Sequence, residues 1–314
     1  MPKVLITGAC GQIGTELTLT LRKRYGDENV VTSDFKEPEN EIFKEGKHYK
    51  LDVLDRKRLD DILKFEEVDH IYHLAALLSA KGEENPQRAW EINMNGFFNI
   101  AEASRKFEVK KVFWPSSIAV FGPTTPVNNT PQFTVAEPTT VYGISKLAGE
   151  GWCNYYYHKF GLDIRSLRYP GLISHKTLPG GGTTDYAVDI FHKAVKGEDF
   201  ECFLEEDTRL PMMYMDDAIR ATIELMESPS ENIKVRTSYN VTAISFTPKE
   251  IYNTIKKFYP EFKITYNPDF RQQIAASWPQ SIDDSQAAKD WGWKNEFDLE
   301  KMTKVMLEAL SEKA

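Results

Sequence analysis

Short apolar runs alternate with segments of helical periodicity along the first half of the chain. The apolar runs have the length and β-branched content of buried strands, and they cover residues 3–7, 29–34, 48–51, 69–74, 111–117 and 162–168. Between them, apolar residues recur every three or four positions, which predicts helices from the first turn to about residue 24 and over residues 54–65, 86–107 and 140–160. This alternation predicts an α/β fold with a doubly wound parallel sheet covered by helices on both faces.

The pattern becomes less regular after about residue 170. Short strands are predicted near residue 203 and over residues 235–241 and 263–266, and helices over residues 215–226, 248–258, 285–291 and 299–310. A glycine-rich turn at residues 179–185 precedes a further helix. We therefore predict two domains with chain crossings between them. Residues 1–170 carry the main sheet, and residues 171–314 form a smaller C-terminal α/β portion that supplies substrate contacts.

Three glycines, Gly8, Gly11 and Gly14, follow the first predicted strand and precede the first predicted helix. In such a turn the first glycine permits the sharp bend, the second lets a pyrophosphate approach the backbone, and the third lets the helix pack close to the sheet. Asp34 ends the next predicted strand twenty residues after Gly14, where a carboxylate binds the ribose diol of an adenosine. An ordinary glycine turn is the alternative, but strand, helix and acid together indicate a dinucleotide site in a Rossmann-type domain.

The bulk composition is that of an ordinary globular protein, with 314 residues and a formal net charge of -8. The negative charge argues against a nucleic-acid partner and against an anionic membrane surface. The sequence shows neither a basic apolar leader nor an apolar run of ~18 residues, so we expect no membrane span. Cys10, Cys153 and Cys202 are an odd, scattered set, which indicates a reducing, cytoplasmic setting without disulfides. No H-E-x-x-H or C-x-x-C motif occurs, so no metal site is expected.

Tyr142 and Lys146 form a Y-x-x-x-K pair on the helix predicted over residues 140–160. Residues i and i+4 share one face of a helix, so the ammonium lies near the phenol and lowers its pKa below the reference value of about 10. A tyrosine of this kind is a general base near neutral pH, although a helix-start tyrosine beside a surface lysine is the alternative. Only Tyr142 follows a strand that ends in serines. Three other pairs share the spacing: Tyr155/Lys159, Tyr252/Lys256 and Tyr259/Lys263.

Ser116 and Ser117 end the strand predicted before that helix. Because side chains alternate along a strand, only one of the two hydroxyls turns toward a substrate. We expect Ser117 to hold the substrate oxygen near Tyr142, with Ser116 as the rival; both serines could instead merely end the strand.

These motifs together resemble those of the extended short-chain dehydrogenase/reductase family. The shared positions are Gly8–Gly14, Asp34, Asp52, Leu74–Ala76, Asn93–Gly96, Ser116–Ser117, Tyr142 and Lys146. Four longer segments resemble the L-threonine 3-dehydrogenase branch of that family, and they cover residues 114–123, 179–186, 211–215 and 277–284. The resemblance extends over essentially the whole chain.

The resemblance implies a metal-independent, NAD-dependent oxidation of L-threonine at C3 to L-2-amino-3-oxobutanoate. Tyr142 would be the general base, Ser117 would bind the reacting oxygen, and Lys146 would bind the nicotinamide ribose. Asn93 would serve either a proton relay or the packing behind Lys146. The implied cofactor-binding residues are Gly8, Gly11, Gln12, Ile13, Gly14, Asp34, Asp52, Val53, Leu74, Ala75, Ala76, Asn93, Tyr142, Lys146, Tyr169, Gly171 and Leu172.

The implied substrate-binding residues are Ser79, Ser117, Tyr142, Thr183, Thr184 and Trp278. Two of these have competing structural interpretations. Thr184, or its neighbour Asp185, could N-cap the following helix. Trp278 could belong to the core. Members of the family are usually dimers that pair long helices, so a homodimer through residues 86–107 and 140–160 is expected.

Two other functions remain open at this point. A nucleotide-sugar epimerase or dehydratase of the same family would need basic residues for a diphosphate. Its candidates are Arg165, Arg168, Arg209 and Arg220. A catalytically silent, NAD-binding regulator is the third possibility, and the intact set of Ser117, Tyr142 and Lys146 argues against it.

Overall fold

The computed structural model describes residues 1–38, 40–176 and 182–312. The chain divides into two compact units, and each unit is assembled from three separate segments. The first unit consists of Met1–Ser116, Thr140–Arg168 and Ile219–Tyr239. The second unit consists of Ser117–Thr139, Tyr169–Ala218 and Asn240–Ala314.

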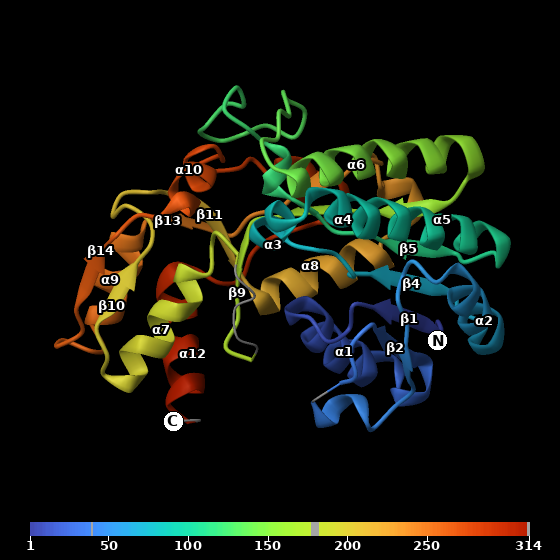
Figure 1. Ribbon diagram of the computed structural model, residues 1–314, viewed down its shortest axis with the longest axis horizontal. Coiled ribbons are helices and arrows are strands. Elements are labelled where there is room, and N and C mark those ends of the chain that lie inside the picture. The colour runs from blue at the N-terminus through green and yellow to red at the C-terminus, as the bar shows by residue number, and fades with distance from the viewer. Residues whose placement is uncertain (39, 177–181, 313–314) are drawn as a thin grey trace. The chain divides into compact units, whose positions relative to one another are not determined.

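A six-stranded parallel sheet forms the centre of the first unit, in the order β3-β2-β1-β4-β5-β7 (Figure 1). The strands are β1 (Val4–Thr7), β2 (Val30–Asp34), β3 (His48–Lys50), β4 (His70–His73), β5 (Lys111–Phe113) and β7 (Asp163–Arg165). The chain proceeds outward from β1 to β3 and then returns to β4 on the other side of β1. This order creates the switch point at which Rossmann folds bind nucleotides, and it confirms the predicted fold class.

Helices cover the first unit's sheet on both faces (Figure 1). They are α1 (Gln12–Tyr25), α2 (Arg56–Glu66), α3 (Ser79–Glu84), α4 (Pro86–Trp90), α5 (Gly96–Lys106), α6 (Val141–Phe160) and the later part of α8 (Met215–Glu227). Asp55 and Thr140 begin α2 and α6 by accepting backbone N–H bonds from Arg58 and Gly143, as side-chain N-caps do. Gly161 ends α6 with a φ of 70°, a left-handed conformation that suits glycine.

Three predicted elements of the first unit differ from the sequence-based expectation. The helix predicted over residues 86–107 is interrupted by a π-helical turn at Glu91–Asn95 between α4 and α5. The strand predicted over residues 111–117 is broken after β5 and resumes only as β6 (Ser116–Ser117). Pro115 accounts for this break, because proline has no N–H to donate to a strand ladder. The strand predicted over residues 162–168 likewise divides into β7 and β8 (Leu167–Tyr169).

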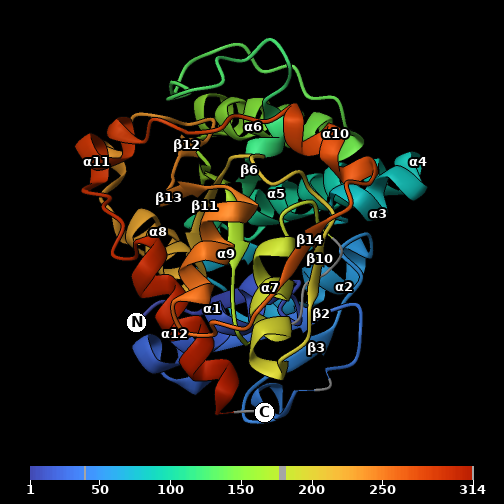
Figure 2. The same ribbon diagram turned by 90° about the vertical axis from the view of Figure 1, so that its left-hand side faces the viewer.

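The second unit contains two small sheets, β13-β11-β9 and β10-β14, and a group of packed helices, α7, α9 and α12 (Figure 2). The strands are β9 (Gly171–Ile173), β10 (Phe200–Cys202), β11 (Leu210–Tyr214), β13 (Ile244–Phe246) and β14 (Ile264–Tyr266), and β12 (Tyr239–Asn240) lies at the boundary between the units. The helices are α7 (Tyr186–Lys196), α9 (Pro248–Lys256), α10 (Phe270–Ala276), α11 (Ser285–Trp291) and α12 (Leu299–Ser311). Strands β9, β11 and β13 and helix α10 were not predicted, and the strand predicted over residues 235–241 is reduced to β12.

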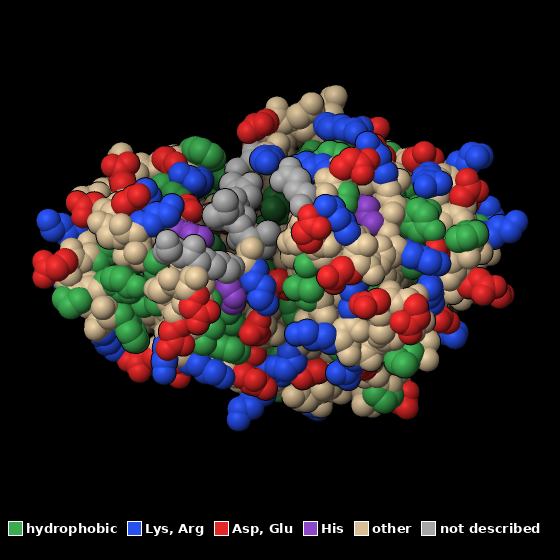
Figure 3. Space-filling view, turned by 90° about the horizontal axis from the view of Figure 1, so that it is seen from below, with side chains coloured by type: hydrophobic (Ala, Val, Ile, Leu, Met, Phe, Trp, Pro, Cys, Tyr) green, Lys and Arg blue, Asp and Glu red, His purple; other side chains and the backbone are tan. Residues whose placement is uncertain are grey.

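Acidic and basic side chains are interspersed on the face of the molecule shown in Figure 3. The described residues on that face therefore form no continuous basic stripe of the kind that binds a nucleic-acid backbone. Within the described ranges, no helix is long and apolar enough to cross a bilayer.

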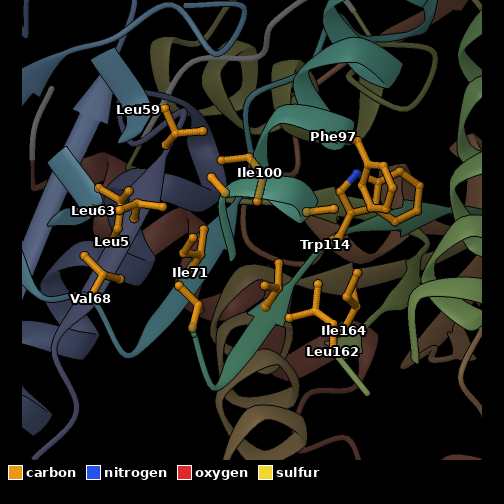
Figure 4. Packing of buried hydrophobic residues seen from close by; sticks show 14 of the residues in the cluster. Leu5, Leu59, Leu63, Val68, Ile71, Phe97, Ile100, Trp114, Leu162 and Ile164 are labelled. Carbon is orange, nitrogen blue, oxygen red and sulfur yellow. The ribbon is translucent and has the colours of Figure 1, made fainter. Parts of the chain in front are cut away.

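A hydrophobic cluster joins the first unit's sheet to α2, α5 and α6 (Figure 4). Leu5, Ile71 and Ile164 contribute from the sheet, and Leu63 and Phe97 contribute from α2 and α5. This cluster fixes the strands whose carboxyl ends carry the candidate site.

Candidate active site

The three glycines of the turn after β1 have two different roles. Gly8 has a φ of +71°, and a Cβ there would lie 2.6 Å from Ala75 N; a Cβ at Gly14 would lie 2.6 Å from the carbonyl oxygen of Ala9. Gly11 is exposed, and a Cβ there would meet only the carbonyl oxygen of Gly8, at 3.4 Å. Gly8 and Gly14 are therefore required by the fold. Gly11 leaves free the space that a pyrophosphate needs at the start of α1.

Asp34 is buried at the end of β2, and its carboxylate is held against the glycine turn. One oxygen accepts the backbone N–H of Cys10 at 3.0 Å, and the other accepts that of Lys36 at 3.1 Å. Burial, followed by the charge of Asp34, raises the pKa of the Cys10 thiol to about 12, so this thiol stays protonated at neutral pH. The structure therefore fits a dinucleotide, with Asp34 placed for the ribose and the turn for the phosphates.

Other predicted cofactor residues lie on the loops that follow the strands. Leu74, Ala75 and Ala76 are half-buried just after β4, and the N–H of Leu74 donates to Thr7 O at 2.9 Å. Asp52 is exposed and accepts the N–H of Leu54 at 3.0 Å, while Val53 is buried against Gly96. Gln12 and Ile13 begin α1, next to the turn. All of them follow strands of one sheet, at the edge where such sheets bind ligands.

His73, at the end of β4, is a site-bordering residue that the sequence did not single out. Its Nδ1 lies 2.7 Å from Thr7 Oγ1, while its Nε2 has no hydrogen-bond partner within the described part of the chain. Burial, together with the nearby charge of Lys146, lowers the pKa of His73 to about 3. The sequence signal that could have identified His73 is its place as a polar residue at the end of the apolar run at residues 70–73.

Asn93 lies on the π-helical turn, and its carboxamide holds the loop after β4. Its Oδ1 accepts the N–H of Leu77 at 2.8 Å, and its Nδ2 donates to Leu77 O at 3.1 Å and to Ser145 Oγ at 3.2 Å. Both amide hydrogens are therefore engaged within the protein. This favours the packing role over the proton-relay role for Asn93, and π-helical turns often occur at functional sites.

Tyr142 and Lys146 occupy the first turns of α6. The Nζ of Lys146 lies 5.4 Å from the centroid of the Tyr142 ring and donates to the carbonyl oxygen of Pro115 at 2.6 Å. Lys146 is only 2% exposed, and burial lowers its pKa to about 7. The ammonium therefore lies beside the Tyr142 ring, on the shared helix face that the Y-x-x-x-K spacing predicts.

The structure separates the roles of the two serines. Ser116 Oγ donates to Glu150 Oε1 at 2.6 Å, and Arg168 donates to both oxygens of the same carboxylate at 2.8 and 2.7 Å. All three side chains are buried. Ser116 is thus engaged in the interior, and strand alternation turns Ser117 to the opposite side, where it is half-buried. Ser117 remains the candidate for the reacting oxygen.

Two of the predicted substrate-binding residues, Thr183 and Thr184, lie just before α7 in the second unit. Thr183 is 1% exposed, and its Oγ1 has no hydrogen-bond partner within the described part of the chain. Thr184 packs on Gly171, where a Cβ would lie 2.8 Å from its Cγ2. The helix begins at Asp185 without a side-chain cap, because that carboxylate accepts the N–H of Gly182 instead, at 2.6 Å. Capping therefore does not explain Thr184, and the orphaned Thr183 hydroxyl is available to a ligand.

The other predicted contacts lie in separate elements. Tyr169 is buried in β8, and Leu172 is half-buried in β9. Trp278 is buried directly after α10, and Ser79 is buried at the first position of α3. Gly180 and Gly181 of the predicted glycine-rich turn lie outside the described residues.

The arginines that a nucleotide-sugar enzyme would use for a diphosphate each donate to a carboxylate of this chain. Arg165 pairs with Asp163 at 2.7 Å and also donates to the carbonyl oxygens of Leu225 and Ser228. The other three pairs are Arg168–Glu150, Arg209–Glu250 and Arg220–Glu224. Their charges are therefore largely compensated within the protein.

A parallel sheet of this order, with its glycine turn, the acid that ends β2 and the Tyr142/Lys146 pair, is typical of the Rossmann class of enzymes that use a nicotinamide dinucleotide. The sequence pattern of the NAD dependent epimerase/dehydratase family matches residues 4–242, and the chain belongs to that family. This confirms the resemblance to the extended short-chain dehydrogenases and reductases. In the described residues, no group of three or more His, Cys, Asp or Glu side chains could hold a metal ion.

Several relatives are similar to this chain over nearly its whole length. The holo form of an L-threonine dehydrogenase from Cupriavidus necator is 56% identical over 98% of this chain and 100% of that one, with a TM-score of 0.97. The mitochondrial L-threonine 3-dehydrogenase of Bos taurus is 49% identical over 97% of this chain and 82% of the bovine protein. A monomeric L-threonine 3-dehydrogenase from a metagenome is 47% identical over 99% of each chain, with a TM-score of 0.95.

Proposed function

We propose that this protein catalyses the NAD-dependent oxidation of L-threonine at C3 to L-2-amino-3-oxobutanoate. The observation that carries the proposal is the buried ammonium of Lys146, 5.4 Å from the Tyr142 ring at the start of α6. The names of the relatives support L-threonine as the substrate.

The chain's own residues account for the proton transfer. Tyr142, as a phenolate stabilised by Lys146, takes the hydroxyl proton of the substrate, and Ser117 donates a hydrogen bond to the same oxygen. The glycine turn, Asp34 and Lys146 would hold the phosphates and the two riboses of the cofactor. Bound NAD would supply the acceptor for the hydride that leaves C3. The orphaned hydroxyl of Thr183 is available for a polar group of the substrate.

The charge of Asp34 supports NAD rather than NADP. The carboxylate is fixed by two backbone N–H groups, and a 2′-phosphate at the ribose would meet a like charge. Replacing Asp34 with Ala and the exposed neighbour Phe35 with Arg is therefore expected to shift the preference toward NADP. Equal discrimination before and after the change, measured as the ratio of kcat/KM for the two cofactors, would show that Asp34 does not contact the ribose.

The paired arginines favour L-threonine over a nucleotide sugar. A diphosphate would have to compete with the carboxylate partners of Arg165, Arg168, Arg209 and Arg220. The test follows NADH formation with L-threonine and, separately, the conversion of UDP-sugars. Turnover of the sugar alone would reject the dehydrogenase.

The Tyr142→Phe variant distinguishes the dehydrogenase from a silent regulator. Loss of a general base costs typically 10²- to 10⁴-fold in rate, so kcat should fall by about that factor while NAD affinity is retained. A wild-type protein that binds NAD, oxidises nothing and is unaffected by this substitution would support the regulator instead.

We also propose that the protein is a homodimer that pairs helices α5 and α6. Three large apolar residues of α6, Ile144, Trp152 and Tyr155, are exposed on one side of that helix, and Trp152 packs on Phe98 of α5 at 5.0 Å. Light scattering of the wild type and of Trp152→Glu tests this. We expect the wild type to be a dimer and Trp152→Glu, which places a charge on this face, to be a monomer. A monomeric wild type, like the metagenomic relative, would reject the dimer. The three free cysteines support a cytoplasmic setting.

A further inference from the structure

The indole of Trp114 lies directly beside the ammonium of Lys146. The Nζ of Lys146 is 4.4 Å from the centroid of the Trp114 ring, closer than its 5.4 Å to the Tyr142 ring. Both Trp114 and Lys146 are only 2% exposed. A cation at this distance over an indole is attracted by the ring's negative face, and the attraction is strongest when water is excluded.

Gly149 keeps the indole against α6. A Cβ at Gly149 would lie 2.3 Å from Cη2 and 2.5 Å from Cζ2 of Trp114, so any side chain there would push the ring away. On another side, the Phe97 ring packs edge-on against the indole at 5.5 Å, as Figure 4 shows for the two labelled residues. The indole is therefore held in a fixed position against α6, at the helical turn that follows Lys146.

The ammonium has little else to stabilise its charge. Burial lowers the pKa of Lys146 to about 7, and the charged or titratable groups around it are few. Tyr142, Glu150 and Cys153 face it from its own helix, and neutral His73 lies on β4. From the loop between β5 and β6, the Pro115 carbonyl oxygen accepts a hydrogen bond from the ammonium, and the Trp114 ring lies beside it.

We propose that Trp114 is a positioning residue that keeps Lys146 charged and aligned with Tyr142 through a cation–π contact. The proposal rests on the proposed role of Lys146 beside the base. Trp114 itself touches neither the reacting atoms nor the proton that moves. It acts through Lys146, because a charged Lys146 stabilises the Tyr142 phenolate.

The first test measures the charge of Lys146 directly, in the protein without cofactor. Lysine labelled with ¹³C at Cε is titrated by NMR, and the Lys146 signal is identified by its loss in Lys146→Met. In Trp114→Leu, which removes the ring face, we expect the Lys146 pKa to fall by about one unit. In Trp114→Phe, which keeps a weaker aromatic face, the fall should be smaller.

The matched control is Phe97→Leu. Phe97 packs in the same cluster and touches the same indole, but it supplies no ring to Lys146. If Trp114 were only a packing residue, Phe97→Leu and Trp114→Leu would shift the titration alike. An unchanged Lys146 pKa in Trp114→Leu would overturn the proposal.

Gly149→Ala provides an independent route if Trp114→Leu fails to fold. It retains the indole but displaces it from α6, so the Lys146 pKa should again fall. An unchanged Lys146 pKa in a folded Gly149→Ala protein, with the indole displaced, would count equally against the contact.

Activity supplies a second readout. With L-threonine and NAD, the rising limb of the kcat profile should move to higher pH in Trp114→Leu, because less of Lys146 is charged when Tyr142 must ionise. Phe97→Leu should leave the limb in place, and an unmoved limb in Trp114→Leu would overturn the proposal. If the wild type oxidised no L-threonine, the proposed function would fail while the NMR titration still decided the role of Trp114.

Discussion

The carboxylate of Glu150 accepts a 2.6 Å hydrogen bond from the hydroxyl of Ser116, in the interior of the first unit. Arg168 donates to both oxygens of the same carboxylate, at 2.8 and 2.7 Å. The hydroxyl of Ser116 is thereby used in a buried hydrogen bond, which leaves Ser117 as the candidate for the substrate oxygen.

Ser117→Ala should therefore mainly lower the catalytic rate, whereas Ser116→Ala should mainly lower the stability. Loss of the donor to the reacting oxygen in Ser117→Ala is expected to lower kcat on the order of 10²-fold. Its cost in stability should be about 1 kcal/mol, because Ser117 Oγ also accepts the N–H of Ala119 and caps a short 3-10 turn. Ser116→Ala should leave kcat nearly unchanged but lower the free energy of unfolding by about 1.5–3 kcal/mol, because it removes a buried hydrogen bond to a charged group. Steady-state kinetics and urea unfolding of both variants check this, and a larger kcat loss in Ser116→Ala would reverse the assignment.

Glu150→Gln should destabilise the protein by about 3 kcal/mol or more, since it leaves the buried guanidinium of Arg168 without its carboxylate. The side chains of Arg168 and Glu150 are 9% and 3% exposed. Glu91→Gln is the matched control, because its partner Arg88 is also within hydrogen-bonding distance, at 2.5 Å, but the pair is 44% and 46% exposed. Such surface pairs contribute at most about 1 kcal/mol. Equal losses in the two variants, measured by urea unfolding, would show that the buried network is not structural.

Substituting two glycines of the turn should affect stability and cofactor binding separately. Gly14→Ala is expected to lower the melting temperature without cofactor, because its Cβ would lie 2.6 Å from backbone oxygens. Gly11→Ala should keep the melting temperature but weaken NAD binding, since its Cβ would occupy space left for the phosphates. Calorimetric titration with NAD measures the second effect. Unaltered affinity in a folded Gly11→Ala protein would place the pyrophosphate elsewhere.

Buried His73 should make the protein sensitive to acid. Its pKa is about 3 in the folded state and about 6.5 when unfolded, so below pH 6.5 the unfolded chain binds a proton that the folded chain does not. Stability is therefore lost as pH falls, and this histidine accounts for about 2–3 kcal/mol between about pH 7 and pH 4.5. His73→Asn should remove that part of the pH dependence, whereas His158→Asn, at an exposed site on α6, should not. Parallel stability curves for wild type and His73→Asn would contradict this origin.

The regular part of the fold was predictable because its signals are local. The strands β1, β2 and β4 are short apolar runs, the helices α6, α11 and α12 have helical spacing, and all six were placed within one or two residues. Strand β11 was missed because its sequence, LPMMY, contains a proline and no β-branched residue, so it lacks the composition that marked β1 and β2 as strands. The three-residue strands β9 and β13 are too short for a period to appear.

The candidate site was predictable where the residue spacing within one motif determines the arrangement, as in the glycine turn and the Tyr142/Lys146 pair. The choice between Ser116 and Ser117 was not, because it depends on Glu150, 34 residues further along the chain. The contact between Trp114 and Lys146 was equally hidden, since it depends on close packing at Gly149 rather than on spacing.

The first unit's three-part construction limits how the protein can be dissected. Arg165 is buried, and it donates to carbonyl oxygens of residues 225, 226 and 228, while Tyr25 donates to Glu227. A recombinant fragment ending at residue 170 would strip these partners from a guanidinium that has no access to water. The dinucleotide half is thus not a detachable module, and a truncated chain should accumulate as insoluble protein.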